Sequence, residues 1–124
     1  MTLQELYANI GGDYSRAVSV LRIEKLIDKH IRKFPNGGVP EAVIAAGETM
    51  DPTQLFETSH AMKGVCFNLG LVKMGELASE ISEEFRPGNP RTHTDEEVEA
   101  IIAQISALYD RTAQGIRAYE ESAQ

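Results

Sequence analysis

The chain lacks tryptophan, has one cysteine and carries fewer basic than acidic side chains. Its 124 residues include 12 lysines and arginines against 19 aspartates and glutamates, a formal net charge of −7 at pH 7. General nucleic-acid binding needs a basic surface that displaces counterions, so this charge argues against it. Cys66 cannot form an internal disulfide, and we interpret it as a small apolar packing residue in a reducing compartment and not as a reactive thiol.

Long apolar runs and nucleotide-binding motifs are also missing. No stretch approaches the roughly 20 apolar residues of a membrane span. The first residues include Glu5 and lack the basic start and apolar run of a signal peptide. Hydrophobic residues still make up 42% of the chain, enough for one core. We therefore predict a single cytoplasmic domain over residues 1–124, monomeric, with no membrane partner and no nucleotide site of its own.

The apolar residues follow helical periodicity, and no segment alternates like a strand. This pattern predicts an all-α fold, an antiparallel up-down four-helix bundle with one or two additional short helices. We expect helices over residues 3–10, 13–34, 40–46, 52–70, 71–86 and 94–119. The helix over 13–34 has two apolar sides, which predicts that the first short helix lies across it. Its basic end (Lys25, Lys29, His30, Arg32, Lys33) is either a docking patch for an acidic partner or, as we favour, a solvated helix end.

The helix over residues 52–70 has the clearest boundaries. Asp51 suits the N-cap, Pro52 the first helical position, and Gln54 the third position of a capping box. Gly70 can supply the left-handed backbone that ends a helix. Thr94 repeats the capping pattern at the start of the last helix.

The middle of this helix separates a buried side from an outward side. At 100° per residue its apolar side comprises Leu55, Met62, Cys66 and Leu69, and His60 points away from them. Lys63 lies about 60° round from His60 and one turn along, and Gly64 lies close beside it. Glycine inside a helix costs about 1 kcal/mol relative to alanine. Its presence beside an exposed histidine indicates that another molecule approaches closely there.

These residues resemble the signature of histidine-containing phosphotransfer (HPt) domains. The resemblance rests on His60-x-Met62-Lys63-Gly64 followed by Asn68-Leu69-Gly70, and it is strongest over residues 55–85. It implies that His60 is the phosphoacceptor, that Lys63 helps to hold the phosphoryl group, and that Gly64 leaves room for a docking receiver domain. The residues that follow Gly64 are bulkier than the small ones usual in the family, which bears on partner choice.

The resemblance also implies the partners and the limits of the activity. The expected partners are response-regulator receiver domains and a (hybrid) histidine kinase, which would make the protein a phosphocarrier of a two-component phosphorelay and not a kinase. It implies no cofactor or metal site of its own, with magnesium and a second cation expected from the receiver. Two alternatives remain, a phosphate-independent helical adaptor and a detached phosphoacceptor domain of the chemotaxis-kinase type.

Other arrangements of reactive residues are weaker. Glu57 and His60 have the Glu-x-x-His spacing of di-iron bundles, which need a second copy and two further glutamates. Ile27 precedes His30 by three residues, and Pro90 precedes His93, so neither repeats the spacing. No serine or cysteine is placed with a histidine as a catalytic triad requires.

Two aromatic residues project from the same side of this helix as His60. Phe56 precedes it by four residues and Phe67 follows it by seven. Large apolar groups beside a reactive residue indicate a partner-docking surface. The other interpretation is that the first helix, with Leu3, Leu6 and Tyr7, covers one of them.

Overall fold

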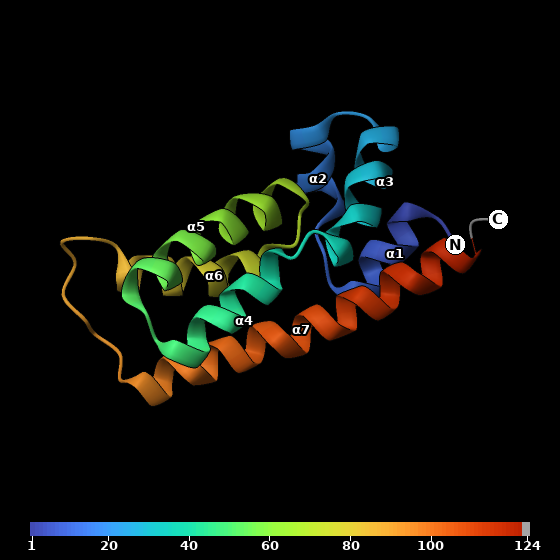
Figure 1. Ribbon diagram of the computed structural model, residues 1–124. Coiled ribbons are helices and arrows are strands. Elements are labelled where there is room, and N and C mark those ends of the chain that lie inside the picture. The colour runs from blue at the N-terminus through green and yellow to red at the C-terminus, as the bar shows by residue number, and fades with distance from the viewer. Residues whose placement is uncertain (123–124) are drawn as a thin grey trace.

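A computed structural model describes residues 1–122 of the chain and shows helices throughout (Figure 1). The elements are α1 (Leu3–Ile10), α2 (Tyr14–Leu21), α3 (Glu24–Lys33), the short 3₁₀ helix η1 (Phe34–Asn36), α4 (Val39–Thr49), α5 (Pro52–Asn68), α6 (Val72–Phe85) and α7 (Asp95–Ser122). No strand occurs in this part of the chain. The all-helical prediction is therefore confirmed.

The four helices α4 to α7 form the body of the molecule. Each contacts two others in a ring, α4 with α5, α5 with α6, α6 with α7, and α7 with α4. The closest pair is α5 and α6, because only three residues connect them and α6 folds back along α5 (Figure 1). Apolar residues of all four helices share one core, which includes Val43, Met62, Ile81 and Ile105.

The N-cap at Asp51 and the glycine stop of α5 form as the sequence predicts, but the Gln54 side chain makes no capping-box bond to the Asp51 backbone. The carboxylate of Asp51 accepts hydrogen bonds from the backbone N–H groups of Thr53 (3.0 Å) and Gln54 (3.3 Å), and Pro52 is the first helical residue. Gly70 has φ +75°, the left-handed backbone that favours glycine. The predicted cap of α7 is also present, since Thr94 and Glu97 each bond the other's backbone N–H.

The predicted single helix over residues 13–34 is wrong. The chain turns sharply after Leu21, where Arg22 has φ +73°, and α2 and α3 pack side by side as a hairpin. A bulky residue rarely adopts a positive φ, and no glycine or proline marks this turn in the sequence. As a consequence, Val20 and Ile23, which periodicity assigns to a buried stripe, are 39% and 54% exposed.

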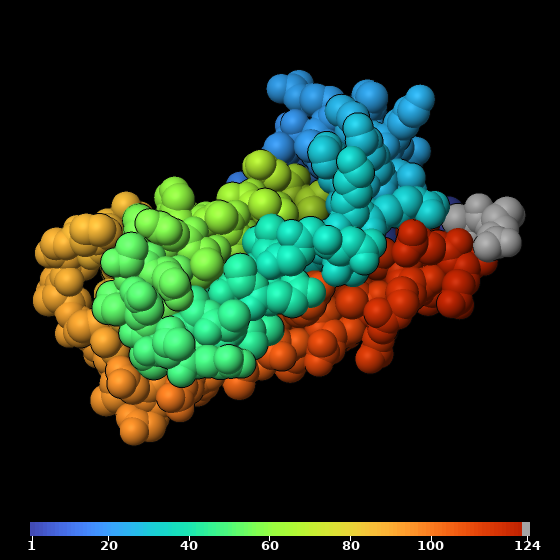
Figure 2. All heavy atoms as spheres, viewed as in Figure 1, coloured from blue at the N-terminus to red at the C-terminus, as the bar shows by residue number. Residues whose placement is uncertain are grey.

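The α2–α3 hairpin is anchored to the C-terminal end of α5. The N–H of Asp13 donates to the carbonyl of Gly70 at 2.7 Å, and a Cβ atom at Gly70 would lie 2.2 Å from the Asp13 carbonyl oxygen. A side chain at position 70 is therefore excluded by space as well as by φ. The hairpin projects from the body of the molecule beside this end of α5 (Figure 2).

The first helix lies mainly on α7, whereas the sequence suggested that it crosses the second helix. Gly115 of α7 makes room for it, because a Cβ atom there would meet the Ile10 side chain. The hydroxyl of Tyr7 donates to the carbonyl of Leu69 at 2.6 Å, which ties α1 to the end of α5. The helix predicted over 40–46 is longer, since α4 begins at Val39 and continues through Gly47 to Thr49. Gly47 lies against Ile102 of α7, where a Cβ atom would meet the Ile102 side chain.

Candidate functional site

The inner side of α5 is fully buried, as its apolar spacing predicts. Leu55, Met62 and Cys66 have no exposed surface, and Leu69 is buried as well. Burial raises the pKa of the Cys66 thiol to about 12. A thiol that stays protonated is a poor nucleophile, so the structure supports a packing role for Cys66.

The outer side of α5 brings His60, Lys63 and Gly64 together. His60 is exposed, Lys63 is half-buried, and a Cβ atom built on Gly64 would meet nothing within 4 Å. The glycine therefore serves neither helix packing nor backbone geometry, since its φ is not in the left-handed region. It leaves a bare strip of helix surface beside the His60 imidazole.

Phe56 contacts His60 directly. The two rings are stacked, with centroids 5.5 Å apart and an angle of 25° between their planes. Residues four apart on a helix are neighbours, so this contact follows from the spacing in the sequence. Phe56 is half-buried, and its ring restricts the directions in which the imidazole can turn.

A cation from α6 completes this arrangement. The Arg86 guanidinium carbon lies 5.4 Å from the centre of the Phe56 ring. Its Nη2 atom donates to the Glu83 carboxylate at 2.7 Å, and this bond lowers the pKa of Glu83, with smaller electrostatic contributions from Lys63 and His60. Sequence reasoning missed Arg86 and Glu83, because nothing in the spacing within α5 shows which residues of α6 lie opposite.

Phe67 belongs to a different part of the surface. Its ring lies over Gly75 of α6, where a Cβ atom would come within 2.9 Å of it, and the Arg16 guanidinium carbon is 5.6 Å from its centre. Phe67 is half-buried between α2 and α6. It does not touch His60 in the way that Phe56 does. Neither ring is buried under α1, whose contacts are mainly with α7.

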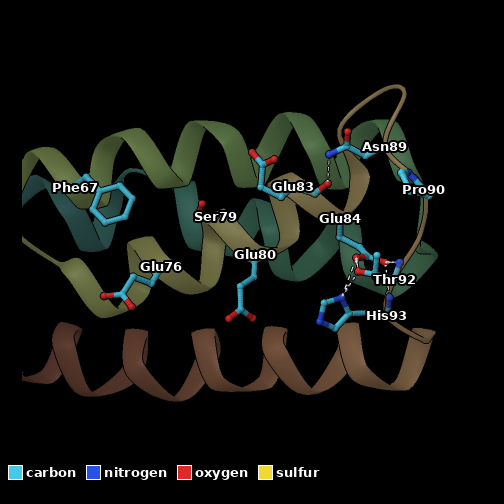
Figure 3. A pocket seen from close by; sticks show the side chains of 10 residues that line it. All are labelled: Phe67, Glu76, Ser79, Glu80, Glu83, Glu84, Asn89, Pro90, Thr92 and His93. Atoms are coloured by element: carbon cyan, nitrogen blue, oxygen red, sulfur yellow. Dashed lines mark hydrogen bonds and ion pairs between the residues drawn. The ribbon is translucent and has the colours of Figure 1, made fainter.

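An acidic hollow of about 590 Å³ lies on the α6 side of Phe67 (Figure 3). Three of its carboxylates, Glu76, Glu80 and Glu83, come from successive turns of α6. Neither His60 nor Lys63 lines it. The outward face of α5 therefore has an acidic flank on the side of α6.

The far end of this hollow is held by a buried carboxylate, Glu84. It accepts hydrogen bonds from the backbone N–H groups of Thr92 and His93, both at 2.8 Å, and from the Thr92 hydroxyl at 2.6 Å. It also pairs with Arg91 (2.9 Å) and the His93 ring (2.8 Å), as Figure 3 shows for His93. Burial alone would raise the pKa of Glu84, but these hydrogen bonds outweigh it and hold the pKa well below its usual range. Sequence reasoning missed this anchor of the α6–α7 connection.

The other two histidines have different surroundings. His93 bonds Glu84, and this bond raises the pKa of His93. His30 lies on α3 at the rim of an apolar hollow. Within residues 1–122, no group of three or more histidine, cysteine or acidic side chains is arranged to hold a metal ion, and no helix is long and apolar enough to cross a membrane.

A family model described as "Hpt domain" matches residues 20–115, which is well over half of the chain. The match includes all of α3 to α6 and most of α7, together with every residue of the site on α5. No curated protein and no solved structure matches the chain.

Proposed function

This chain belongs to the Hpt domain family, whose members transfer phosphoryl groups through a histidine in phosphorelays, and from that premise we propose that His60 is its phosphoacceptor. The observation that carries the proposal is the outward face of α5. There an exposed imidazole, an amine and a bare glycine share one side of a helix whose opposite side is completely buried. His30 and His93 have no such setting.

His60 has the chemistry that a reversible carrier requires. Neutral imidazole is a nucleophile near neutral pH. The lone pair of one ring nitrogen forms the phosphorus–nitrogen bond while the phosphorus–oxygen bond to a receiver aspartate breaks and the carboxylate leaves. The other ring nitrogen keeps its proton during this step. The reverse reaction returns the group to an aspartate, so the same site accepts and donates.

The neighbours of His60 have separate roles in this proposal. Lys63 lies one turn along the helix, where its ammonium group can neutralise the non-bridging oxygens of the phosphoryl group. Gly64 lets the receiver approach until the reacting atoms are within about 3.5 Å, the distance that in-line transfer needs. Phe56 restricts the imidazole by stacking. Phe67 lies farther along α5, between α2 and α6, where it would meet the edge of a docked partner.

The partners follow from the reaction. A receiver domain supplies the aspartate, and a histidine kinase stands at the start of the relay. We expect the magnesium ion of the exchange to come with the receiver, and no step above depends on a metal held by this chain. We further propose that α4 to α7 form an antiparallel up-down bundle, which the ring of helix contacts supports.

A phosphate chase tests carrier function. The protein would be incubated with ³²P-labelled phosphoramidate, a small phosphodonor that needs no docking surface, purified, and mixed with receiver domains from the same genome. We expect acid-labile, base-stable label that moves to at least one receiver within seconds. Label that stays on the protein with every receiver, or binding of a receiver with no movement of label, would favour a phosphate-independent adaptor.

A further inference from the structure

A second hollow lies on the other flank of the His60 face, between the α2–α3 hairpin and the C-terminal half of α5. Its volume is about 290 Å³, and it is mainly apolar, with Leu21, Val39 and Val65 in its walls and His30, Lys33 and Asn68 at its polar positions. Val65 follows Gly64 directly on α5, and Asn68 comes four residues after Gly64. Asn68 stands two turns, or about 12 Å, along the helix from His60.

We propose that this hollow is the anchor site for the receiver domain, which inserts one apolar side chain there and places carboxylates beside Lys33 and His30. The inference rests on the proposed function and adds the surface that selects the partner. A receiver docked over His60 and Gly64 need extend only about 12 Å along α5 to reach it. Buried anchors in preformed pockets supply much of the affinity of protein interfaces.

The hairpin that forms one wall of the hollow also carries exposed apolar residues. Five large hydrophobic residues among residues 1–122 are exposed, and four of them belong to residues 14–33: Val18, Val20, Ile23 and Leu26. Leu26 is 36% exposed and lies on the same side of α3 as His30 and Lys33, which follow it by four and seven residues. Val18 precedes Leu21 of the hollow by three residues, so the two lie on neighbouring positions of one side of α2. The hairpin therefore carries exposed apolar side chains as well as the apolar wall of the hollow.

The charge of the hairpin identifies the chemistry of the occupant. Residues 14–33 contain six lysines and arginines and two acidic residues, whereas the whole chain has a net charge of −7. Arg32 is engaged with Asp28 at 3.0 Å, but Lys33 and His30 make no ion pair with any of residues 1–122. An acidic partner complements this surface. A symmetric second copy would place two basic hairpins against each other.

The two flanks of α5 together define an orientation. The α6 side presents Glu76, Glu80 and Glu83, and the hairpin side presents cations around an apolar hollow. A partner with one acidic and one basic edge fits over His60 in only one direction, because the reverse direction brings like charges together. A concave hollow also suits a single inserted side chain better than the broad surface of a lipid bilayer.

The test separates docking from chemistry. Protein labelled with phosphoramidate would be mixed with increasing concentrations of a receiver that takes phosphate from the wild type, and the transfer rate measured. Lys33→Glu reverses a cation of the hollow, and Val39→Phe fills the hollow from its α4 wall. We expect each to raise the half-saturating receiver concentration about tenfold or more, the effect of losing about 1.4 kcal/mol, with the maximal rate within about twofold of wild type.

Lys73→Glu is the matched control, because it makes the same charge change at an exposed position of α6 outside the hollow. It should leave the half-saturating concentration within about twofold of wild type. If Lys33→Glu and Val39→Phe both keep the half-saturating receiver concentration of the wild type, the hollow is not the anchor site. That result would leave His60 as the phosphoacceptor. A wild type that takes no phosphate overturns the proposed function and the anchor with it.

Two further measurements address other occupants. In sedimentation, the wild type and Lys33→Glu should have the same oligomeric state. Phosphatidylglycerol vesicles should bind the wild type and Lys33→Glu equally well. A dimer or vesicle complex that this substitution abolishes would assign the hollow to a second copy or to a membrane and overturn the receiver anchor.

Discussion

Gly64 should be a position where a larger side chain stabilises the protein and slows phosphotransfer. Nothing lies within 4 Å of a Cβ atom at this position, so alanine or glutamine there meets no neighbour. Replacing an interior helical glycine gains about 1 kcal/mol of unfolding free energy. For a domain of this size that corresponds to a rise of about 4 °C in Tm.

The effect on transfer has the opposite sign. A glutamine side chain extends into the strip over which the receiver must pass to bring its aspartate to His60. Displacing reacting atoms by about 1 Å can cost about a hundredfold in rate. We therefore expect Gly64→Gln to slow transfer from a phosphorylated receiver about a hundredfold, with Gly64→Ala between it and the wild type.

Rapid-quench phosphotransfer and urea unfolding followed by circular dichroism measure the two effects separately. Ala107→Gln, at an exposed position of α7, should leave transfer unchanged. Gly115→Ala should lower stability by about 1–3 kcal/mol through overpacking, because its Cβ would meet Ile10, and it should also leave transfer unchanged. Wild-type transfer by Gly64→Gln would refute the reasoning, as would a loss of transfer that merely follows a loss of stability.

Two further residues give predictions of different kinds. Lys63→Ala should shorten the lifetime of phosphohistidine or slow transfer with little change in Tm, whereas Lys73→Ala should change neither; equal lifetimes and rates for the two variants would leave Lys63 without a role. Glu84→Gln should lower the unfolding free energy by about 3 kcal/mol, because it breaks a buried charged network, while exposed Glu80→Gln should change it little. Since hydrogen bonding lowers the folded pKa of Glu84, its contribution is complete above the unfolded value of about 4.3 and is lost as the pH falls through the folded pKa. An acid limb of the stability curve that is the same in Glu84→Gln and the wild type would contradict this assignment.

Local signals in the sequence predict α5 and its two sides well. The caps at Asp51 and Gly70 depend on backbone geometry within a few residues, and the burial of Met62 follows from helical spacing alone. The stack of Phe56 on His60 is local too, because the two residues are four positions apart on one helix. The same spacing is also compatible with Phe56 contacting a docked partner. Such features can be recognised without knowing the fold.

Features that depend on contacts between distant segments could not be predicted in this way. The turn at Arg22 has no glycine or proline, and the apolar residues on either side of it continue one helical period, so the sequence favours a single long helix. Tertiary packing of α2 against α3 and α5 decides the matter. The bonds of Glu84 reach residues seven to nine positions away in an irregular segment, where no periodicity applies. The contact of Arg86 with Phe56 beside His60 depends on how α6 is aligned along α5, and the sequence does not give this alignment.

His60 is the residue on which we propose that phosphate is carried. His60→Gln keeps the bundle intact, because the side chain is exposed and glutamine is a good helix former. His30→Gln and His93→Gln are matched controls, with circular dichroism confirming that all three variants are folded.

Labelling by a ³²P-phosphorylated receiver or a cognate kinase, followed by mapping of the acid-labile phosphate, is the most direct measurement. We expect that His60→Gln takes no label while His30→Gln and His93→Gln take as much as the wild type. A folded His60→Gln protein labelled to wild-type stoichiometry, or phosphate mapped to His30 or His93, would contradict it.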